Sequence, residues 1–518
     1  MLSRFSSPAA GTRRPVGIAA LVGLALLIAT SPVTGTVPAA PAPGQWAAIG
    51  SAATPLIPPA SADAAYVWGI ETGPDGRLYA YGVFQDASGD PTADSLAVLD
   101  PVTGVWQGIG SNGEGDGAIG GQVMDIAWFH GILYVAGAFQ GVGGVVGTDH
   151  LAAWNGTSWT RRAPAGAFNG PVYDLLVNGD TLYASGGFTD LDKAGNAAAP
   201  GDADYVALFD GRTWTGLPGA DGQLTDGVIS IALAPDGSVY AGGLFQNAAG
   251  GKADHVARWD PVAKSWGPLG GVFAVDGAIN DVVSTVALLG GSLYIGGGFD
   301  SPPGGDSTAA YLARWNGSSW VGVGGKDGVP ALDGEPMGLD MYGSNLIVTG
   351  MFSEAGGVAG TAGIAAWNGS RWLSLGGGVS TGGVITASRV GRTLYAAGRF
   401  SSVANAGTAV PSTVDVAAYG LPGGPTAPRS PIATTGSRRV TLAWTAPASA
   451  NGSPVTDYVI QYRKAGTTTW KTFNDGVRTT RSAAVTGLST GTTYELRVRA
   501  LNGWAAGSWS VVVRKVAG

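Results

Sequence analysis

Short segments of alternating hydrophobic and polar residues, bounded by turn residues, recur through most of the chain. The clearest recurrence is Leu-Tyr-x-x-Gly-x-Phe, with modest substitution, which starts at Leu78, Leu133, Leu182, Val239, Leu293, Leu346 and Leu394. Every copy keeps the glycine and the phenylalanine, and successive copies are 48 to 57 residues apart. Alternation over short segments predicts β-strands, and the regular spacing predicts a repeat architecture.

Three further strand-like segments accompany each copy of this pattern. A short alternating run such as Val123–Ile126 precedes it, a segment such as Leu312–Asn316 follows it, and a segment that begins with tryptophan, as at Trp320, usually comes last. Turn sequences such as Asn-Gly-Ser-Ser and Pro-Asp-Gly separate the segments. Four strands in each of seven units predict a seven-bladed β-propeller over residues 46–420, because four-stranded blades bury their faces only against their neighbours.

The two ends of the repeat predict how the ring closes. The last unit has no tryptophan-led strand after Val416–Tyr419, whereas Trp46–Gly50 precedes the first unit without a partner of its own. We therefore expect residues 46–50 to form the outer strand of the last blade. This pairing would remove an open strand edge that favours aggregation.

The repeats resemble those of known propellers. The segment Ala-Arg-Trp-Asp-Pro-Val-Ala-Lys-Ser-Trp at 257–266 is similar to the kelch repeat of galactose-oxidase-like propellers. The segments at 293–299 and 312–320 look like the repeats of fungal cortical polarity-marker proteins and their bacterial secreted relatives. This resemblance covers residues 46–420 and implies the fold, but no single function, because propellers serve as enzymes and as binding proteins.

The last hundred residues have a different pattern. Residues 421–431 are rich in proline and glycine and predict a linker. Alternating strands are then expected at 440–444, 458–463 and 494–500, and Leu488–Tyr494 resembles a tyrosine corner. Residues 432–518 thus resemble a fibronectin type III domain with Trp444, Leu488 and Tyr494 as core and corner residues. The predicted fold class is all-β, a propeller followed by an Ig-like β-sandwich.

Residues 1–40 have the pattern of a signal peptide. Arg4, Arg13 and Arg14 precede an apolar run at Val16–Ala29, and small residues follow it. An ordinary secretory signal fits better than a twin-arginine signal, because no further motif supports the arginine pair. The apolar run is shorter than a retained membrane anchor requires, so no membrane span is expected after cleavage. We expect a secreted, extracellular protein, with association to the cell surface left open.

Composition narrows the possible chemistry. The chain has no cysteine, which excludes thiolate nucleophiles, Cys-ligated zinc and iron–sulfur clusters. The net charge is −7, and we expect it to be spread along the chain because no Lys/Arg-rich run appears. This charge argues against a nucleic-acid or anionic-membrane partner. Copper-radical oxidases share the kelch-like architecture but need a Tyr–Cys crosslink and histidine ligands. His130, His150 and His255 are scattered, and we expect them in loops or at the surface.

One column of residues is expected to face the central channel. Counting back from each Leu-Tyr gives Gly69, Asp125, Asp174, Ser230, Thr285, Gly338 and Thr386. Asp125 and Asp174 fall in adjacent blades, so they are candidates for a catalytic acid/base pair or a calcium site. The alternative, favoured here, is a channel lining solvated by water. Calcium has no other support, and no cofactor is expected.

Loop lengths indicate where a partner would bind. The next strand starts 11 to 18 residues after each phenylalanine, and the connection between one unit and the next is also long. In a four-stranded meander these two connections emerge on one face. We therefore expect an extracellular binding or scaffold protein that recognises a polysaccharide, a cell-wall polymer or a protein through this long-loop face. The alternative is a polysaccharide-acting hydrolase or lyase with a fibronectin type III accessory module.

Overall fold

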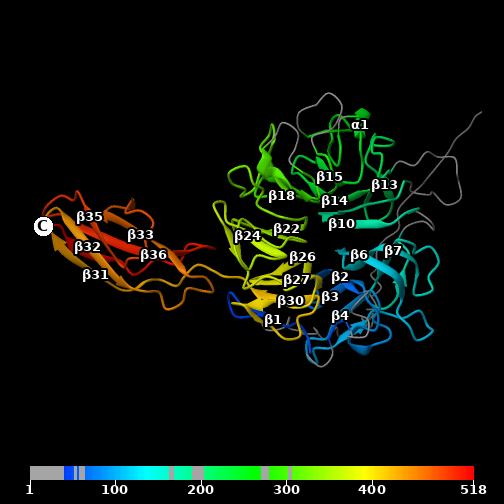
Figure 1. Cartoon of the computed structure of the whole chain (residues 1–518), viewed down its shortest axis with the longest axis horizontal. Helices are drawn as coiled ribbons and strands as arrows, with labels where there is room; N and C mark the ends of the chain where they lie inside the picture. The colour runs from blue at the N-terminus through cyan, green and yellow to red at the C-terminus, as the bar shows by residue number, and fades with distance from the viewer. Residues whose placement is uncertain are drawn as a thin grey trace, which may run out of the picture. The chain divides into compact units, whose positions relative to one another are not determined.

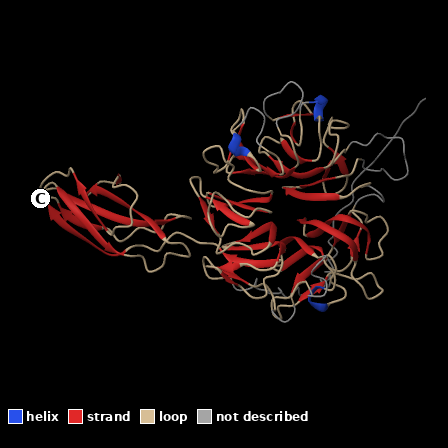
Figure 2. Cartoon of the chain, in the orientation of Figure 1, coloured by secondary structure: helices blue, strands red, loops and turns tan. Residues whose placement is uncertain are grey.

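A computed structural model of the chain describes residues 40–51, 55–57, 65–162, 168–189, 203–251, 253–269, 279–300 and 306–518. The predicted signal peptide lies, except for its last residue, outside the described residues. Strands and turns dominate, and the described helical turns are short: η2 (Ala87–Gly89), α1 (Ala248–Gly251) and η3 (Ser307–Ala309) (Figure 2). The fold class is all-β, as predicted. Across these described ranges, no helix is both long and apolar enough to span a membrane.

Seven four-stranded antiparallel sheets form from residues 46–420 in the described part of the chain (Figure 1). Six of them are consecutive four-stranded meanders. The first three are β2 (Tyr66–Thr72), β3 (Leu78–Val83), β4 (Leu96–Leu99) and β5 (Trp106–Gly108); β6 (Ile119–Phe129), β7 (Ile132–Val142), β8 (Leu151–Trp154) and β9 (Trp159–Thr160); and β10 (Val172–Asn178), β11 (Thr181–Gly186), β12 (Val206–Phe209) and β13 (Trp214–Gly216). The next three are β14 (Val228–Leu233), β15 (Val239–Gly243), β16 (Val256–Asp260) and β17 (Ser265–Pro268); β18 (Val283–Leu289), β19 (Ser292–Gly297), β20 (Leu312–Trp315) and β21 (Trp320–Gly322); and β22 (Pro336–Tyr342), β23 (Asn345–Gly350), β24 (Ile364–Trp367) and β25 (Trp372–Ser374). The seventh combines β26 (Gly382–Val390), β27 (Thr393–Phe400) and β30 (Val416–Gly420) with β1 (Trp46–Ala47). A small hairpin, β28 (Ala404–Asn405) and β29 (Thr408–Ala409), lies between β27 and β30.

The seven sheets form a closed ring, called here the sheet ring. The inner strands β2, β6, β10, β14, β18, β22 and β26 each contact the next, and β26 contacts β2 (Figure 1). Apolar side chains fill the space between neighbouring sheets, and the repeated phenylalanines all belong to this core. They are Phe84, Phe139, Phe188, Phe245, Phe299, Phe352 and Phe400, each at most 3% exposed. The repeat pattern therefore reflects burial between sheets.

The N-terminal strand completes the last sheet, as predicted. In β1, Trp46 pairs with Tyr419 of β30. The buried indole Nε1 of Trp46 donates a hydrogen bond to the Leu375 carbonyl at 2.7 Å. Asn405 accepts from the backbone N–H of Trp46 and donates to its carbonyl. The strand spans two residues rather than the expected five, and the chain turns at Gly50, which has a φ of 80°.

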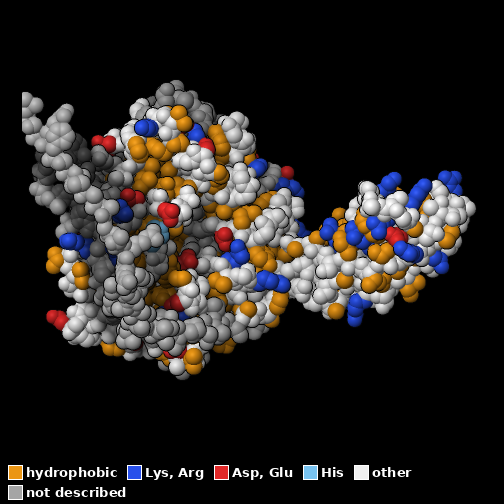
Figure 3. Space-filling model, turned by 180° about the vertical axis from the view of Figure 1, so that it is seen from behind, with side chains coloured by type: hydrophobic (Ala, Val, Ile, Leu, Met, Phe, Trp, Pro, Cys, Tyr) orange, Lys and Arg blue, Asp and Glu red, His pale blue; other side chains and the backbone are white. Residues whose placement is uncertain are grey.

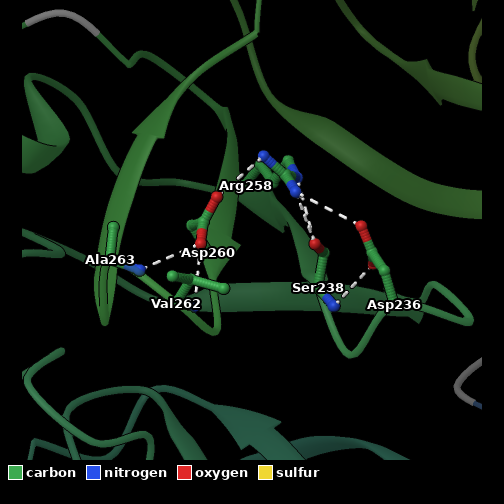
Figure 4. A network of polar contacts seen from close by, with 6 residues as sticks. All are labelled: Asp236, Ser238, Arg258, Asp260, Val262 and Ala263. Carbon is green, nitrogen blue, oxygen red and sulfur yellow. Dashed lines mark hydrogen bonds and ion pairs between the residues drawn. The ribbon is translucent and has the colours of Figure 1, made fainter.

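The turn between the third and fourth strands repeats from sheet to sheet. In β16, Asp260 accepts the backbone N–H groups of Val262 and Ala263, and Arg258 links Asp260 to Asp236 and Ser238 (Figure 4). The same side-chain-to-backbone turn forms at Asp100, Asn155, Asp210, Asn316 and Asn368. Asp and Asn favour such turns because their side-chain oxygens reach the N–H two residues ahead.

The C-terminal domain is a two-sheet sandwich. One sheet contains β31 (Arg429–Gly436), β32 (Arg439–Thr445) and β35 (Ser482–Thr486); the other contains β33 (Val455–Lys464), β34 (Lys471–Phe473), β36 (Thr493–Asn502) and β37 (Val513–Val516). Trp444, Leu488 and Tyr494 are buried in its core, as predicted. The Tyr494 hydroxyl accepts the backbone N–H of Ser489 at 3.1 Å, which is the contact of a tyrosine corner.

The boundary of this domain differs from the sequence prediction. Strand β31 begins at Arg429, inside the stretch 421–431 that was expected to be a linker. Its register is irregular between Arg429 and Ile432, which accommodates Pro431 on an edge strand that tolerates a missing N–H donor. Upstream, the Thr426 N–H already bonds to the Ser449 carbonyl of the domain at 2.9 Å. The proline-rich stretch is therefore part of the sandwich edge from about Thr426 onward.

Candidate functional site

The column of residues expected along the channel occupies one structural position in every sheet. In each inner strand the register shifts immediately before the column residue, as between Val123 and Asp125 in β6 and between Val172 and Asp174 in β10. The other five inner strands show the same shift at their column residues. A bulge twists a strand and redirects the side chains that follow. Asp125, Asp174, Ser230, Thr285 and Thr386 all line one cavity of about 490 Å³.

These column side chains link one sheet to the next. Asp125 Oδ2 accepts the backbone N–H of Leu175 in the following inner strand at 2.7 Å. Asp174 Oδ2 accepts the N–H of Ile231 at 3.0 Å, and Ser230 Oγ accepts the N–H of Val286 at 3.2 Å. In all three cases the residue that donates its N–H comes directly after the column residue of the following inner strand. Because these three side chains occupy the same position in their strands and bond to the equivalent N–H of the next strand, they have a structural role in holding adjacent inner strands together.

The structure brings Asp125 and Asp174 close enough to influence one another. Burial raises the pKa of Asp125 well above its usual range, and the neighbouring charge of Asp174 raises it further. Burial raises the pKa of Asp174 to about 6, although hydrogen bonds from the Ile231 N–H and from Asp125 act in the opposite direction. Two adjacent carboxyl groups in a poorly solvated site favour retention of a proton.

The hydrogen-bond partners of Asp125 restrict what its carboxyl group can do chemically. Asp125 Oδ1 accepts both the Ile126 N–H and the Tyr81 hydroxyl, while its Oδ2 accepts the Leu175 N–H. A general base must present a free lone pair to its substrate. Within the described residues, no group of three or more His, Asp or Glu side chains is arranged to hold a metal ion.

A second cavity lies where long loops meet, and sequence reasoning did not identify it. The loop-side pocket, of about 540 Å³, is lined by the β3–β4 connection, the β5–β6 connection with the start of β6, and the end of β7. The two long connections do come together, because the Gly117 N–H of the β5–β6 connection approaches Asp94 Oδ2 of the β3–β4 connection at 3.3 Å. At the end of β5, the Gly108 N–H bonds to Asp90 Oδ2 at 3.0 Å. This contact agrees with the single long-loop face expected from the loop lengths.

Carboxylate and amide groups dominate the polar lining of the loop-side pocket. Asp94 is half-buried, Asp116 is exposed, and Gln85, Asn112 and Gln140 are exposed on the pocket wall. Burial raises the pKa of Asp94, and its hydrogen bond with Asp116 raises it further. The sequence signal for this pocket is an aspartate two residues before the third strand, seen at 94, 149, 204 and 254. This repeated aspartate could have predicted a polar site in the loops.

The three histidines do not converge. His130 is exposed and lies 3.2 Å from Asp180. His150 and His255 precede the third strand of their sheets with φ near 60°, and each Nδ1 lies about 3 Å from a glycine carbonyl of the second strand. His255 is buried and lies in the connection directly before β16, which agrees with the expected loop position. The left-handed backbone turns its ring back onto its own sheet.

Charge is divided unequally along the chain, contrary to the expectation that it is evenly spread. Residues 421–518 hold 12 of the 29 Lys and Arg residues but only 3 of the 36 Asp and Glu residues. The remainder of the chain is therefore strongly acidic and the C-terminal domain strongly basic. Figure 3 shows Lys and Arg side chains over much of the visible surface of this domain.

Comparison with known proteins identifies the C-terminal part of the chain. A family model for the fibronectin type III domain matches residues 426–516. The chain is similar to the twitchin kinase region from C. elegans at 28% identity, over 18% of this chain and 17% of that one, with a TM-score of 0.17. It is similar to titin kinase and its flanking domains at 26% identity, with the same coverage and TM-score. The chain thus spans 17% of the length of each of these proteins. Residues 426–516 form a fibronectin type III domain.

Proposed function

We propose that this chain is a secreted, extracellular binding protein whose sheet ring is a seven-bladed, kelch-like β-propeller. Its ligand is a neutral polysaccharide held in the loop-side pocket. The observation that carries this proposal is the lining of that pocket, where Asp116, Asn112 and Gln85 on two connections and Gln140 in strand β7 present carboxylate and amide groups. The fibronectin type III domain fits an extracellular binding or scaffold role.

The chemistry of the pocket favours a ligand rich in hydroxyl groups. Amide side chains both donate and accept hydrogen bonds, and carboxylates accept them, so the set complements sugar hydroxyls that do both. A protein partner would be recognised best by exposed aromatic or arginine anchors, and neither occurs among the described residues that line the pocket. The acidic surroundings, which include Asp94 and Asp116, disfavour an anionic ligand.

A polysaccharide-acting enzyme is the second candidate. The raised pKa values of Asp125 and Asp174 favour it, because a general acid must hold its proton near neutral pH. The repeated structural links of the same side chains weigh against it, since Ser230 forms the same link without a carboxylate. For this reason we rank binding above catalysis.

Binding of the full chain to a panel of neutral polysaccharides, by affinity electrophoresis or a glycan array, tests the proposal. Asp116→Asn should weaken binding of the retained polysaccharide about fivefold, the cost of one impaired hydrogen bond. The control is Asp221→Asn, which removes an exposed carboxylate from the β13–β14 connection of another sheet. It should leave binding unchanged.

Two results would overturn this proposal. Equal affinity of the wild type and Asp116→Asn would place the ligand elsewhere. Release of reducing sugar ends by the wild type, but not by Asp125→Asn or Asp174→Asn, would replace binding with catalysis in the channel.

A further inference from the structure

The outer face of one fibronectin type III sheet concentrates the positive charge of this domain. Strand pairing places Arg463, Arg497 and Arg499 on one face of β33 and β36, because Arg463 pairs with Glu495 and residues two apart in a strand share a face. Arg514 of β37 pairs with Glu495 and joins them. The opposite face of these strands is the buried core. Four arginines thus share a face on which Glu495 supplies one negative charge.

Two tryptophans hold the guanidinium groups in a stack. The guanidinium carbons of Arg463 and Arg497 lie 4.4 and 4.1 Å from the centre of the Trp470 ring. Those of Arg497 and Arg499 lie 4.3 and 4.6 Å from the centre of the Trp509 ring. Guanidinium groups stacked on indole rings lose conformational freedom before any ligand arrives. Their orientation is therefore fixed in advance.

The stack leaves positive charge uncompensated. Glu495 engages Arg463 and Arg514 at 2.7 Å each, and the other two arginines form no ion pair with it. Arg497 donates to the neutral Gln461 amide. The buried Nε of Arg499 has no hydrogen-bond partner among the described residues. Burial, followed by the nearby charges of Arg463 and Arg499, lowers the pKa of Arg497. An anion placed here would relieve this repulsion.

We propose that this arginine–tryptophan face, defined by Arg463, Trp470, Arg497, Trp509, Arg499 and Arg514, binds a linear anionic polysaccharide. Carboxylate or sulfate groups of the polymer accept hydrogen bonds from the outward edges of Arg497, Arg499 and Arg514. Planar guanidinium groups match such oxyanions in a bidentate manner. This site is separate from the loop-side pocket and does not depend on the function proposed there.

The same stack favours a polysaccharide over a nucleic acid. Single-stranded nucleic acids are bound by stacking of bases on open aromatic faces. Here each indole ring is already covered by two guanidinium groups. The face therefore offers charge and hydrogen-bond donors but no free aromatic platform, which suits a polymer recognised by its acidic groups.

Retention of the full chain on immobilised polygalacturonate at an ionic strength of about 0.1 M, where the Debye length is about 10 Å, tests this inference. Neutral dextran and a single-stranded oligodeoxynucleotide serve as comparison probes. Arg499→Gln and Arg514→Gln should each weaken polygalacturonate binding about five- to tenfold, as expected for loss of a charge-assisted hydrogen bond. The matched control is Arg439→Gln, which removes the same charge from an exposed position in the other sheet. It should leave affinity within about twofold, because separated charges are screened.

The outcomes separate a site from a general charge effect. Equal weakening by Arg439→Gln and Arg499→Gln would overturn the inference, as would retention of the oligodeoxynucleotide alone or no retention of polygalacturonate. Arg514 lies outside the stack, so its variant answers the question even if Arg499→Gln disturbs the fold; near-ultraviolet circular dichroism of the tryptophans reports such a disturbance. If Arg499→Gln or Arg514→Gln lost polygalacturonate binding but kept neutral polysaccharide binding, the loss would belong to the arginine–tryptophan face and not to the loop-side pocket.

Discussion

At the residue scale, Asp174 shows how a half-buried carboxyl group links stability to pH. Its pKa is about 6 in the folded chain, against 3.8 for the ordinary side chain. Between these two values the folded state binds more protons than the unfolded state. The free energy of unfolding therefore falls as the pH rises from about 4 to about 6, and stability is greatest on the acidic side of this interval.

Asp174→Asn should remove this part of the pH dependence. The asparagine keeps an oxygen for the Ile231 N–H but carries no charge, so it should stabilise the chain at pH 7 by on the order of 1–2 kcal/mol. Urea unfolding at pH 4, 5, 6 and 7 measures the effect.

The control for this change is Asp100→Asn, at a turn position where other sheets carry asparagine. Hydrogen bonds from the Thr103 and Val102 N–H groups lower the pKa of Asp100, so its titration lies outside the interval from pH 4 to 6. A pH profile of Asp174→Asn identical to that of the wild type would show that folding does not raise the pKa of Asp174.

The positions of the channel residues could be predicted from the sequence, but their partners could not. Counting back from each Leu-Tyr locates Asp125 and Asp174 because the repeat fixes the register of each strand. The donors Leu175 and Ile231 lie 50 and 57 residues further along the chain. Their identity depends on how adjacent sheets pack, which a pattern within one repeat does not contain.

At the scale of elements, the two-residue strand β1 closes the last sheet. The contacts of Trp46 with Leu375 and Asn405 reach across more than 300 residues of sequence. The orphaned Trp46 segment could be predicted to fill the missing strand, because every other sheet ends on a tryptophan-led strand. Its length could not, because it depends on where the chain leaves the sheet edge, which is after Ala47.

Trp46→Ala should destabilise the chain by about 3–5 kcal/mol, since it removes a buried aromatic side chain and leaves the Leu375 carbonyl without its donor. Thermal or urea unfolding followed by tryptophan fluorescence measures the change. Val102→Ala, at a side chain that is 90% exposed, should change stability by less than about 0.5 kcal/mol. If the two variants unfolded at the same midpoint, β1 would contribute nothing to closure.

At the scale of the whole molecule, repeat and domain organisation follow directly from the sequence, whereas the binding surfaces do not. Periodicity shows which strands share a sheet, and Leu488–Tyr494 indicates the sandwich. The loop-side pocket joins residues of two sheets, and the arginine–tryptophan face joins strands that are distant in sequence. The uneven distribution of charge can be counted in the sequence, where residues 421–518 hold 12 Lys and Arg residues. The net charge of −7 for the whole chain does not show this local excess.

The central claim is that the loop-side pocket binds a neutral polysaccharide. Hydrogen–deuterium exchange of the full chain, with and without the polysaccharide that it retains, tests this claim most directly. We expect slower amide exchange at 85–95 and 109–122, the segments that line the pocket. Protection confined to residues 123–129 of β6 and to β10, beside Asp125 and Asp174, with 85–95 and 109–122 unchanged, would contradict binding in the pocket.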